Sequence, residues 1–196
     1  MLLPFAWDES GLWYMAATVI AIIPAIWKLS DHDPWATAAW LLSPLTLGMF
    51  WQRNIDWMIV VGLAVTPAWA WMFLPAKLHL GIAALIANVR HDWNARALAI
   101  LAIVATGTTL MVFDRDSARL LAGDWNGATL WPWTIAPGLL IAWLYPGPVG
   151  LVAASCFLFP YIGKYSFALA TLPLLKSRRW MIVCCLLAWA GIGVML

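Results

Sequence analysis

Long apolar runs fill almost the whole chain, and only short polar stretches separate them. The clearest runs are Leu12–Trp27, Trp35–Trp51, Ile55–Leu74 and Ala97–Phe113. About 20 apolar residues are needed to cross the ~30 Å hydrocarbon layer of a bilayer, and about half of the runs approach that length. Because 64% of the residues are hydrophobic and only 10% are charged, against about 25% charged in a typical soluble domain, the surface lacks the usual polar groups. The sequence therefore predicts an all-α polytopic integral membrane helical bundle in the cell inner membrane. We expect a single transmembrane domain over residues 1–196, with about six to eight segments.

Proline and tryptophan add detail to this prediction. The chain contains 12 prolines, many near the centres of the runs, which predicts that some segments are short or broken. It also contains 16 tryptophans, most of them at the ends of runs. Such a distribution is typical of the aromatic belt at a membrane interface, whereas Trp40 and Trp189 are more central and are interpreted as packing residues.

Charge and cysteine content exclude several classes of function. The 11 Lys and Arg residues against 9 Asp and Glu residues give a net charge of +2, which is too small for a nucleic-acid-binding surface. Cys156, Cys184 and Cys185 all lie inside apolar runs and are predicted to be small buried hydrophobic residues. No cysteine–histidine spacing typical of a metal site occurs, so neither a metal nor a cofactor is predicted.

The first candidate site is the polar stretch Asp31-His32-Asp33 after the first run. Two carboxylates beside an imidazole suit a divalent cation or acid–base chemistry, which makes Asp31 and Asp33 the candidate catalytic residues. The alternative is a solvated turn whose Asp33-Pro34 step starts the next helix.

Charged residues inside or beside apolar runs form a second group of candidates. Asp56, Lys77 and Lys164 lie near the ends of runs, and such charges are costly and often functional. Lys77 and Lys164, together with Arg115 and Arg119 in the loop Asp114–Gly127, are candidates for binding a phosphate or a lipid headgroup. The alternatives are that Asp56 and Lys77 reach solvent with their side chains, that Lys164 is an interfacial anchor, and that the loop is a solvated surface helix.

Short motifs resemble a known enzyme family. The stretch Gln52–Asp56, the following apolar run to Leu74-Pro75-Ala76-Lys77 and the short helix ending at Arg90 are similar to a pattern in C-type, polyprenol-phosphate-dependent membrane glycosyltransferases. The mannosyltransferase-like members with a domain of unknown function show the likeness most. Phe159-Pro160-Tyr161, Leu172–Leu175 and Lys176–Arg179 resemble a later element of these enzymes.

The resemblance implies a shortened version of that fold and a lipid-phosphate sugar donor. The family's catalytic acid lies in the loop after the first span, where Asp31 or Asp33 stands here; Lys164, Arg115 or Arg119 would then contact the phosphate. The order Pro75-Ala76-Lys77 differs from the family's Lys-Pro element, and the long loop around the acid is missing.

Three functions follow from these observations. The first is a small membrane protein with a structural or accessory role, a subunit of a larger assembly whose partners are membrane lipids and other membrane protein subunits. The alternative is a glycosyltransferase-like enzyme. The second alternative is a transporter, for which the broken segments speak, although no internal repeat of the span pattern is evident.

Overall fold

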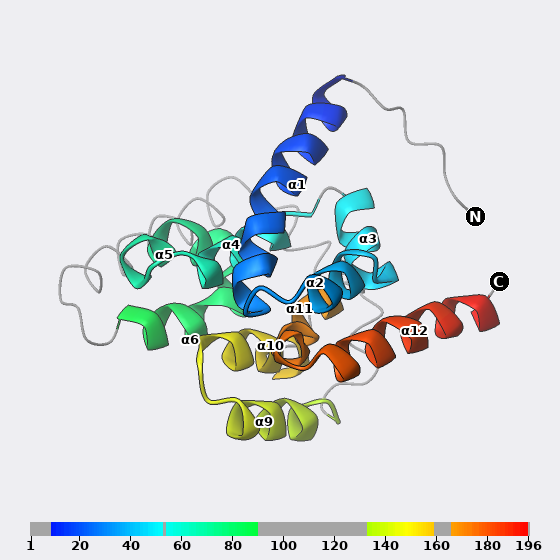
Figure 1. The fold of residues 1–196 in the computed structure, drawn as a ribbon. Helices are drawn as coiled ribbons and strands as arrows, with labels where there is room; N and C mark the ends of the chain where they lie inside the picture. Colours follow the sequence, from blue (N-terminus) through cyan, green and yellow to red (C-terminus); the bar gives the residue numbers. More distant parts are fainter. Residues whose placement is uncertain (1–8, 53, 90–132, 159–165, 196) are drawn as a thin grey trace, which may run out of the picture.

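The computed structural model describes residues 9–52, 54–89, 133–158 and 166–195, and every regular element in these ranges is helical (Figure 1). Two helices are long, and the remaining elements are short. In chain order the elements are α1 (Glu9–Leu29), α2 (Pro34–Leu41), α3 (Pro44–Trp51), α4 (Asp56–Ala64), α5 (Pro67–Phe73), the 3₁₀ helix η1 (Leu74–Lys77), α6 (Leu78–Val89), α9 (Ile135–Leu144), α10 (Pro148–Leu158), α11 (Phe167–Ala170), the 3₁₀ helix η4 (Leu172–Lys176) and α12 (Arg178–Met195).

Proline determines where many of these helices begin. Pro34, Pro44, Pro67 and Pro148 are the first residues of α2, α3, α5 and α10, a position where the missing N–H of proline costs no hydrogen bond. The Asp33 carboxylate caps α2 by accepting hydrogen bonds from the backbone N–H groups of Trp35 (2.9 Å) and Ala36 (3.1 Å). The prediction that the Asp33-Pro34 step starts a helix is confirmed.

The same prolines divide the apolar runs that were expected to be membrane spans. The run Trp35–Trp51 forms α2 and α3, of eight residues each, and the run Ile55–Leu74 is broken at Pro67. At 1.5 Å per residue, an eight-residue helix is about 12 Å long, less than half of the hydrocarbon layer. Over the described ranges, no helix combines the length and the apolar character that crossing a membrane requires. The predicted polytopic membrane bundle and its location in the inner membrane are therefore wrong, while the all-α prediction agrees with these elements.

The core forms where α2 meets the first and last helices. Trp40 is fully buried, and its indole Nε1–H donates a hydrogen bond to the backbone oxygen of Ala168 (3.3 Å). Ile22 and Ile26 from α1 and Met181 from α12 are also fully buried in this core. The interpretation of Trp40 as a packing residue is confirmed.

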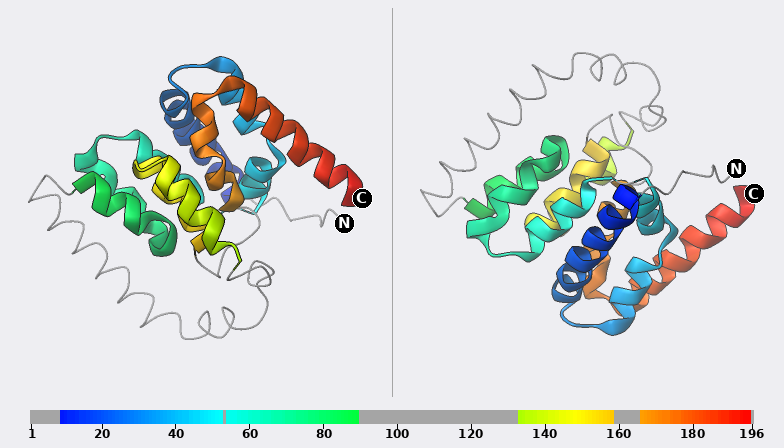
Figure 2. Two further views of the ribbon diagram at one scale, coloured as in Figure 1. Left: turned by 90° about the horizontal axis from the view of Figure 1, so that it is seen from below. Right: turned by 90° about the horizontal axis from the view of Figure 1, so that it is seen from above.

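Two helical pairs form the rest of the body. The first pair is α4–α5, which α1 covers along α4. The second pair is α9–α10, in which α10 packs between α6 and α9. In Figure 1, α9 forms the lower edge of the molecule; in the view from below in Figure 2 it lies in front of α10. The two pairs thus differ in position: one is enclosed and the other ends at the surface.

Candidate functional site

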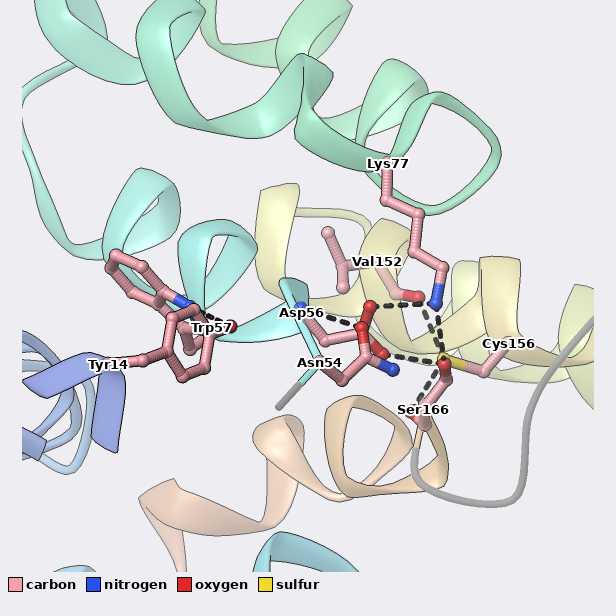
Figure 3. A network of polar contacts seen from close by, with 8 residues as sticks. All are labelled: Tyr14, Asn54, Asp56, Trp57, Lys77, Val152, Cys156 and Ser166. Atoms are coloured by element: carbon pink, nitrogen blue, oxygen red, sulfur yellow. Dashed lines mark hydrogen bonds and ion pairs between the residues drawn. The ribbon is translucent and has the colours of Figure 1, made fainter. Parts of the chain in front are cut away.

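A buried carboxylate lies at the start of α4. Asp56 has no exposed surface, and an unpaired carboxylate in such a place would be highly unfavourable. Its Oδ1 atom accepts a hydrogen bond from the Lys77 ammonium at 2.8 Å, and its Oδ2 atom accepts one from the Ser166 hydroxyl at 2.6 Å (Figure 3). Lys77 Nζ also lies 3.2 Å from Ser166 Oγ. We call Asp56, Lys77 and Ser166 the polar triad.

Three separate elements bring the triad together. Asp56 is the first residue of α4, Lys77 is the last residue of η1, and Ser166 immediately precedes α11. Lys77 and Ser166 lie 21 and 110 positions from Asp56 along the chain. Asn54 orients the start of α4, because its Oδ1 atom accepts a hydrogen bond from the Asp56 N–H at 3.2 Å. The triad therefore ties segments that local structure alone would not hold together.

Cys156 extends the contacts of the triad into α10. Its sulfur lies 3.4 Å from the backbone oxygen of Ser166 and 3.6 Å from that of Val152 (Figure 3). Burial, and to a smaller extent the nearby Asp56 carboxylate, raises the pKa of the Cys156 thiol far above its ordinary value. A thiol held in its neutral form is a weak nucleophile and a poor metal ligand. Cys156 and Cys185 are buried as predicted, and Cys184 is partly buried.

The geometry of the triad suits structural fixation better than chemistry. A serine hydroxyl that donates to a carboxylate has the contact that activates a nucleophile. However, Ser166 is fully buried, so a substrate atom has no approach to its Oγ atom in this conformation. Across the described part of the chain, no group of three or more histidine, cysteine, aspartate or glutamate side chains is arranged to hold a metal ion.

The candidate acids Asp31 and Asp33 lie elsewhere, in the exposed turn between α1 and α2. Asp31 pairs with Lys176 at 2.7 Å, and Asp33 pairs with Arg178 at 2.8 Å. The hydrogen bond from the Arg178 guanidinium lowers the pKa of the Asp33 carboxyl, as do, less strongly, the two backbone N–H groups that it caps. Asp31 and His32 have φ angles of 53° and 66°, a left-handed conformation that is uncommon outside glycine. The two acids therefore fasten the α1–α2 turn to the start of α12.

The other predicted site residues have different outcomes. Lys77 is described, and it pairs with buried Asp56 instead of reaching solvent as an isolated charge. Lys164, Arg115 and Arg119 lie outside the described residues. Sequence reasoning missed Ser166, since a serine in an apolar run carries no local signal; the only clue was that Asp56 needed partners.

Exposed apolar side chains gather on two helices. On α9, the exposed fractions are 58% for Leu139, 51% for Leu140, 77% for Trp143 and 56% for Leu144. Gly138 is the one residue of α9 that is fully buried. The outer side of α12 likewise exposes large side chains, namely Trp180, Val183, Leu186, Leu187 and Trp189.

No protein-family model, curated protein or solved structure matches this chain. The resemblance to C-type glycosyltransferases therefore stays a prediction from short motifs. The function has to be inferred from the triad, the exposed ion pairs and the apolar surfaces themselves.

Proposed function

We propose that this chain is an accessory subunit that packs its exposed apolar helices against other protein subunits of a larger assembly. The observation that carries the proposal is the outer face of α9, where Leu139, Leu140, Trp143 and Leu144 are all more than half exposed. Contiguous apolar surface of this kind marks protein-binding sites, and tryptophan is enriched among the residues that dominate binding energy.

The composition of α9 supports a protein partner. Its sequence, Ile135–Leu144, contains no charged residue, and the centres of protein–protein interfaces are depleted in charge. The polar triad complements this role, because it fixes α4, η1 and α11 and leaves the outer helix free to present its surface. In this proposal the triad holds the scaffold and α9 makes the contact.

The test is native purification of the full chain with chemical cross-linking. We expect a neighbouring subunit to co-purify in a fixed ratio and to be lost when Trp143 and Leu144 are both changed to serine. Ile86→Ser on α6, which also removes an exposed apolar side chain, is the matched control and should leave the ratio unchanged. Recovery of the wild-type chain only as a lone monomer would contradict the proposal.

A second candidate, a glycosyltransferase-like enzyme, has one observation in its favour. Both candidate acids have a cation beside them, Lys176 next to Asp31 and Arg178 next to Asp33, and such cations suit a phosphate-bearing donor. The double variant Asp31→Ala, Asp33→Ala should then fold normally and lose sugar transfer from a polyprenol-phosphate donor. Unchanged transfer in a folded double variant would remove this candidate.

A further inference from the structure

A seven-residue pattern occurs twice in the chain, once in each helical pair. The pattern W-x-I-x-x-G-L covers residues 57–63 in and around α4 and residues 133–139 in and around α9. In each case a second helix that begins with proline follows, and this second helix ends at the dipeptide Phe-Leu or just before its leucine. The dipeptides are Phe73-Leu74 after α4 and Phe157-Leu158 after α9.

The structure gives the two patterns the same contact. A side-chain carbon placed on Gly62 would lie 2.9 Å from Leu74 Cδ2 and 3.0 Å from Phe73 Cβ. A carbon placed on Gly138 would lie 3.0 Å from Leu158 Cδ2 and 3.1 Å from Phe157 Cβ. Each glycine therefore lets its helix approach the Phe-Leu end of the next helix closely. This shared contact makes α4 and α9 equivalent helices.

The outer side of α4 shows what such a helix packs against. The apolar helix α1 covers α4, and Ile59 and Val60 of α4 have no exposed surface. At the start of α4, the indole Nε1–H of Trp57 donates a hydrogen bond to the hydroxyl oxygen of Tyr14 on α1, at 3.0 Å (Figure 3). The cover thus consists of an apolar helix with one hydrogen-bond acceptor at the tryptophan.

The equivalent positions before and along α9 are open. Trp133 corresponds to Trp57 and is 82% exposed, and Leu139 and Leu140 are each more than half exposed. We propose that α9 receives an apolar helix from a partner subunit, in the way that α4 receives α1, and that this helix places a hydrogen-bond acceptor such as a tyrosine hydroxyl on the Trp133 indole. The inference rests on the proposed function and specifies the partner's chemistry.

Two observations define the occupant more closely. Because α9 carries no charge, a charged side chain facing it would lose its hydration without gaining a partner, so the docking face of the partner helix lacks charges. A second copy of this chain cannot supply its own α1, since Thr18, Ile22 and Ile26 of that helix are already buried against the body. The occupant is therefore a helix of a different chain.

A peptide with the sequence of α1 tests the proposal directly. The probe is a synthetic peptide of residues 9–29 with a lysine tag for solubility, added to the full chain carrying a photo-cross-linking amino acid at Trp143. We expect cross-linking at this position and much less when the same amino acid replaces Leu187 on α12, which is also exposed. A peptide with Tyr14→Phe should bind about 2- to 12-fold more weakly, the range for one net hydrogen bond.

Variants of the protein make the hydrogen-bond test specific. Trp133→Phe should weaken the unmodified peptide by the same factor and should make the Tyr14→Phe peptide no weaker still. Equal cross-linking at Leu187, or a Tyr14→Phe peptide that binds as tightly as the original, would overturn the inference. Cross-linking of two copies of the chain through α9 without peptide would overturn it as well.

The outcomes separate this inference from the proposed function. If a subunit co-purifies through Trp143 and Leu144 but cross-links to α9 through a non-helical segment, the accessory function stands and the helix inference fails. If the peptide binds α9 as expected but the chain purifies alone, the proposed function fails while the docking surface remains.

Discussion

The first pair, α4–α5, and the second pair, α9–α10, share one contact and differ in almost everything around it. In both, a glycine packs on a Phe-Leu dipeptide at the end of the following helix. Around the first pair, α1 covers α4 and leaves Ile59 and Val60 fully buried; around the second, Leu139 and Leu140 are more than half exposed. The same local pattern can therefore build either a core or a surface, depending on whether a further helix lies on it.

A single acid adds a second difference. Asp56 precedes the tryptophan of the first pattern, whereas Pro132 precedes that of the second. The first pair is consequently fixed on one side by α1 and on the other by the bonds of Asp56 to Lys77 and Ser166. The second pair has the glycine contact and its packing on α6.

The largest expected effect comes from breaking the ion pair of the first pair. Lys77→Met leaves the Asp56 carboxylate buried without its cation, which should lower the free energy of unfolding by about 3 kcal/mol, since removing one partner of a buried pair is strongly destabilising. Adding Asp56→Asn should recover part of that loss. Chemical denaturation measures both, with exposed Lys28→Met as the control. A loss no larger than that of Lys28→Met would show that the triad does not fix the first pair.

The glycine contacts should differ in a graded way. Gly62→Ala introduces a carbon against Leu74 and Phe73 inside an enclosed pair and should cost about 1–3 kcal/mol. Gly138→Ala meets an equal contact, but α9 can shift outward, so we expect a smaller loss. Gly191→Ala on α12, where no atom lies within 4 Å of the added carbon, should be neutral or gain up to about 1 kcal/mol from helix propensity. Equal losses at positions 62 and 138 would mean that α9 is held as firmly as α4.

The Cys156 thiol can report on the junction between the two pairs. It is buried, and burial raises its pKa, so in a background with Cys184→Ala and Cys185→Ala it should react with iodoacetamide at least about 100-fold more slowly than in the unfolded chain. Lys77→Met should accelerate this reaction by weakening the segment that holds Ser166. A native rate close to the unfolded rate would show that α10 separates readily from the triad.

The smallest effect concerns the exposed pair Asp33–Arg178, which lies outside both helical pairs and serves as their reference. Because the folded state lowers the pKa of Asp33, its contribution to stability is complete above the ordinary carboxyl pKa and is lost as the pH falls through the lowered value. The melting temperatures of wild type and Asp33→Asn should differ by a constant small amount between about pH 7 and pH 5 and converge toward about pH 3. A gap that widens as the pH falls would contradict the sign of this shift.

Local chemistry was predictable from the sequence, and long-range contacts were not. Asp33-Pro34 predicted a helix start, and Asp56 and Lys77 were recognised as costly charges. Their pairing was missed because η1 folds back over 21 positions and Ser166 arrives from 110 positions away. The membrane prediction failed because the length of the apolar runs was weighted above the prolines inside them. Pro44 and Pro67 start new helices, so the runs do not form single long elements.

The repeat shows the same limit from another side. The identical residues of the two patterns are only a tryptophan, an isoleucine, a glycine and a leucine, too few to stand out in a chain so rich in apolar residues. Their equivalence became visible through the contacts of Gly62 and Gly138. The exposed tryptophans expected in a membrane belt include Trp133, whose position follows from that repeat.

The bonds between the two ends of the chain have a consequence for how the protein is made. Trp40 reaches Ala168, Asp31 reaches Lys176 and Asp33 reaches Arg178, across 128, 145 and 145 positions. Synthesis proceeds from the N-terminus, so the surface around Trp40 is exposed on the ribosome until almost the last residue has been added. Closing such distant contacts is slow, and an uncovered apolar surface invites aggregation meanwhile. A nascent chain of this protein therefore depends on chaperones until α12 is released, and a stop codon just before α12 leaves a product that cannot shield its own core.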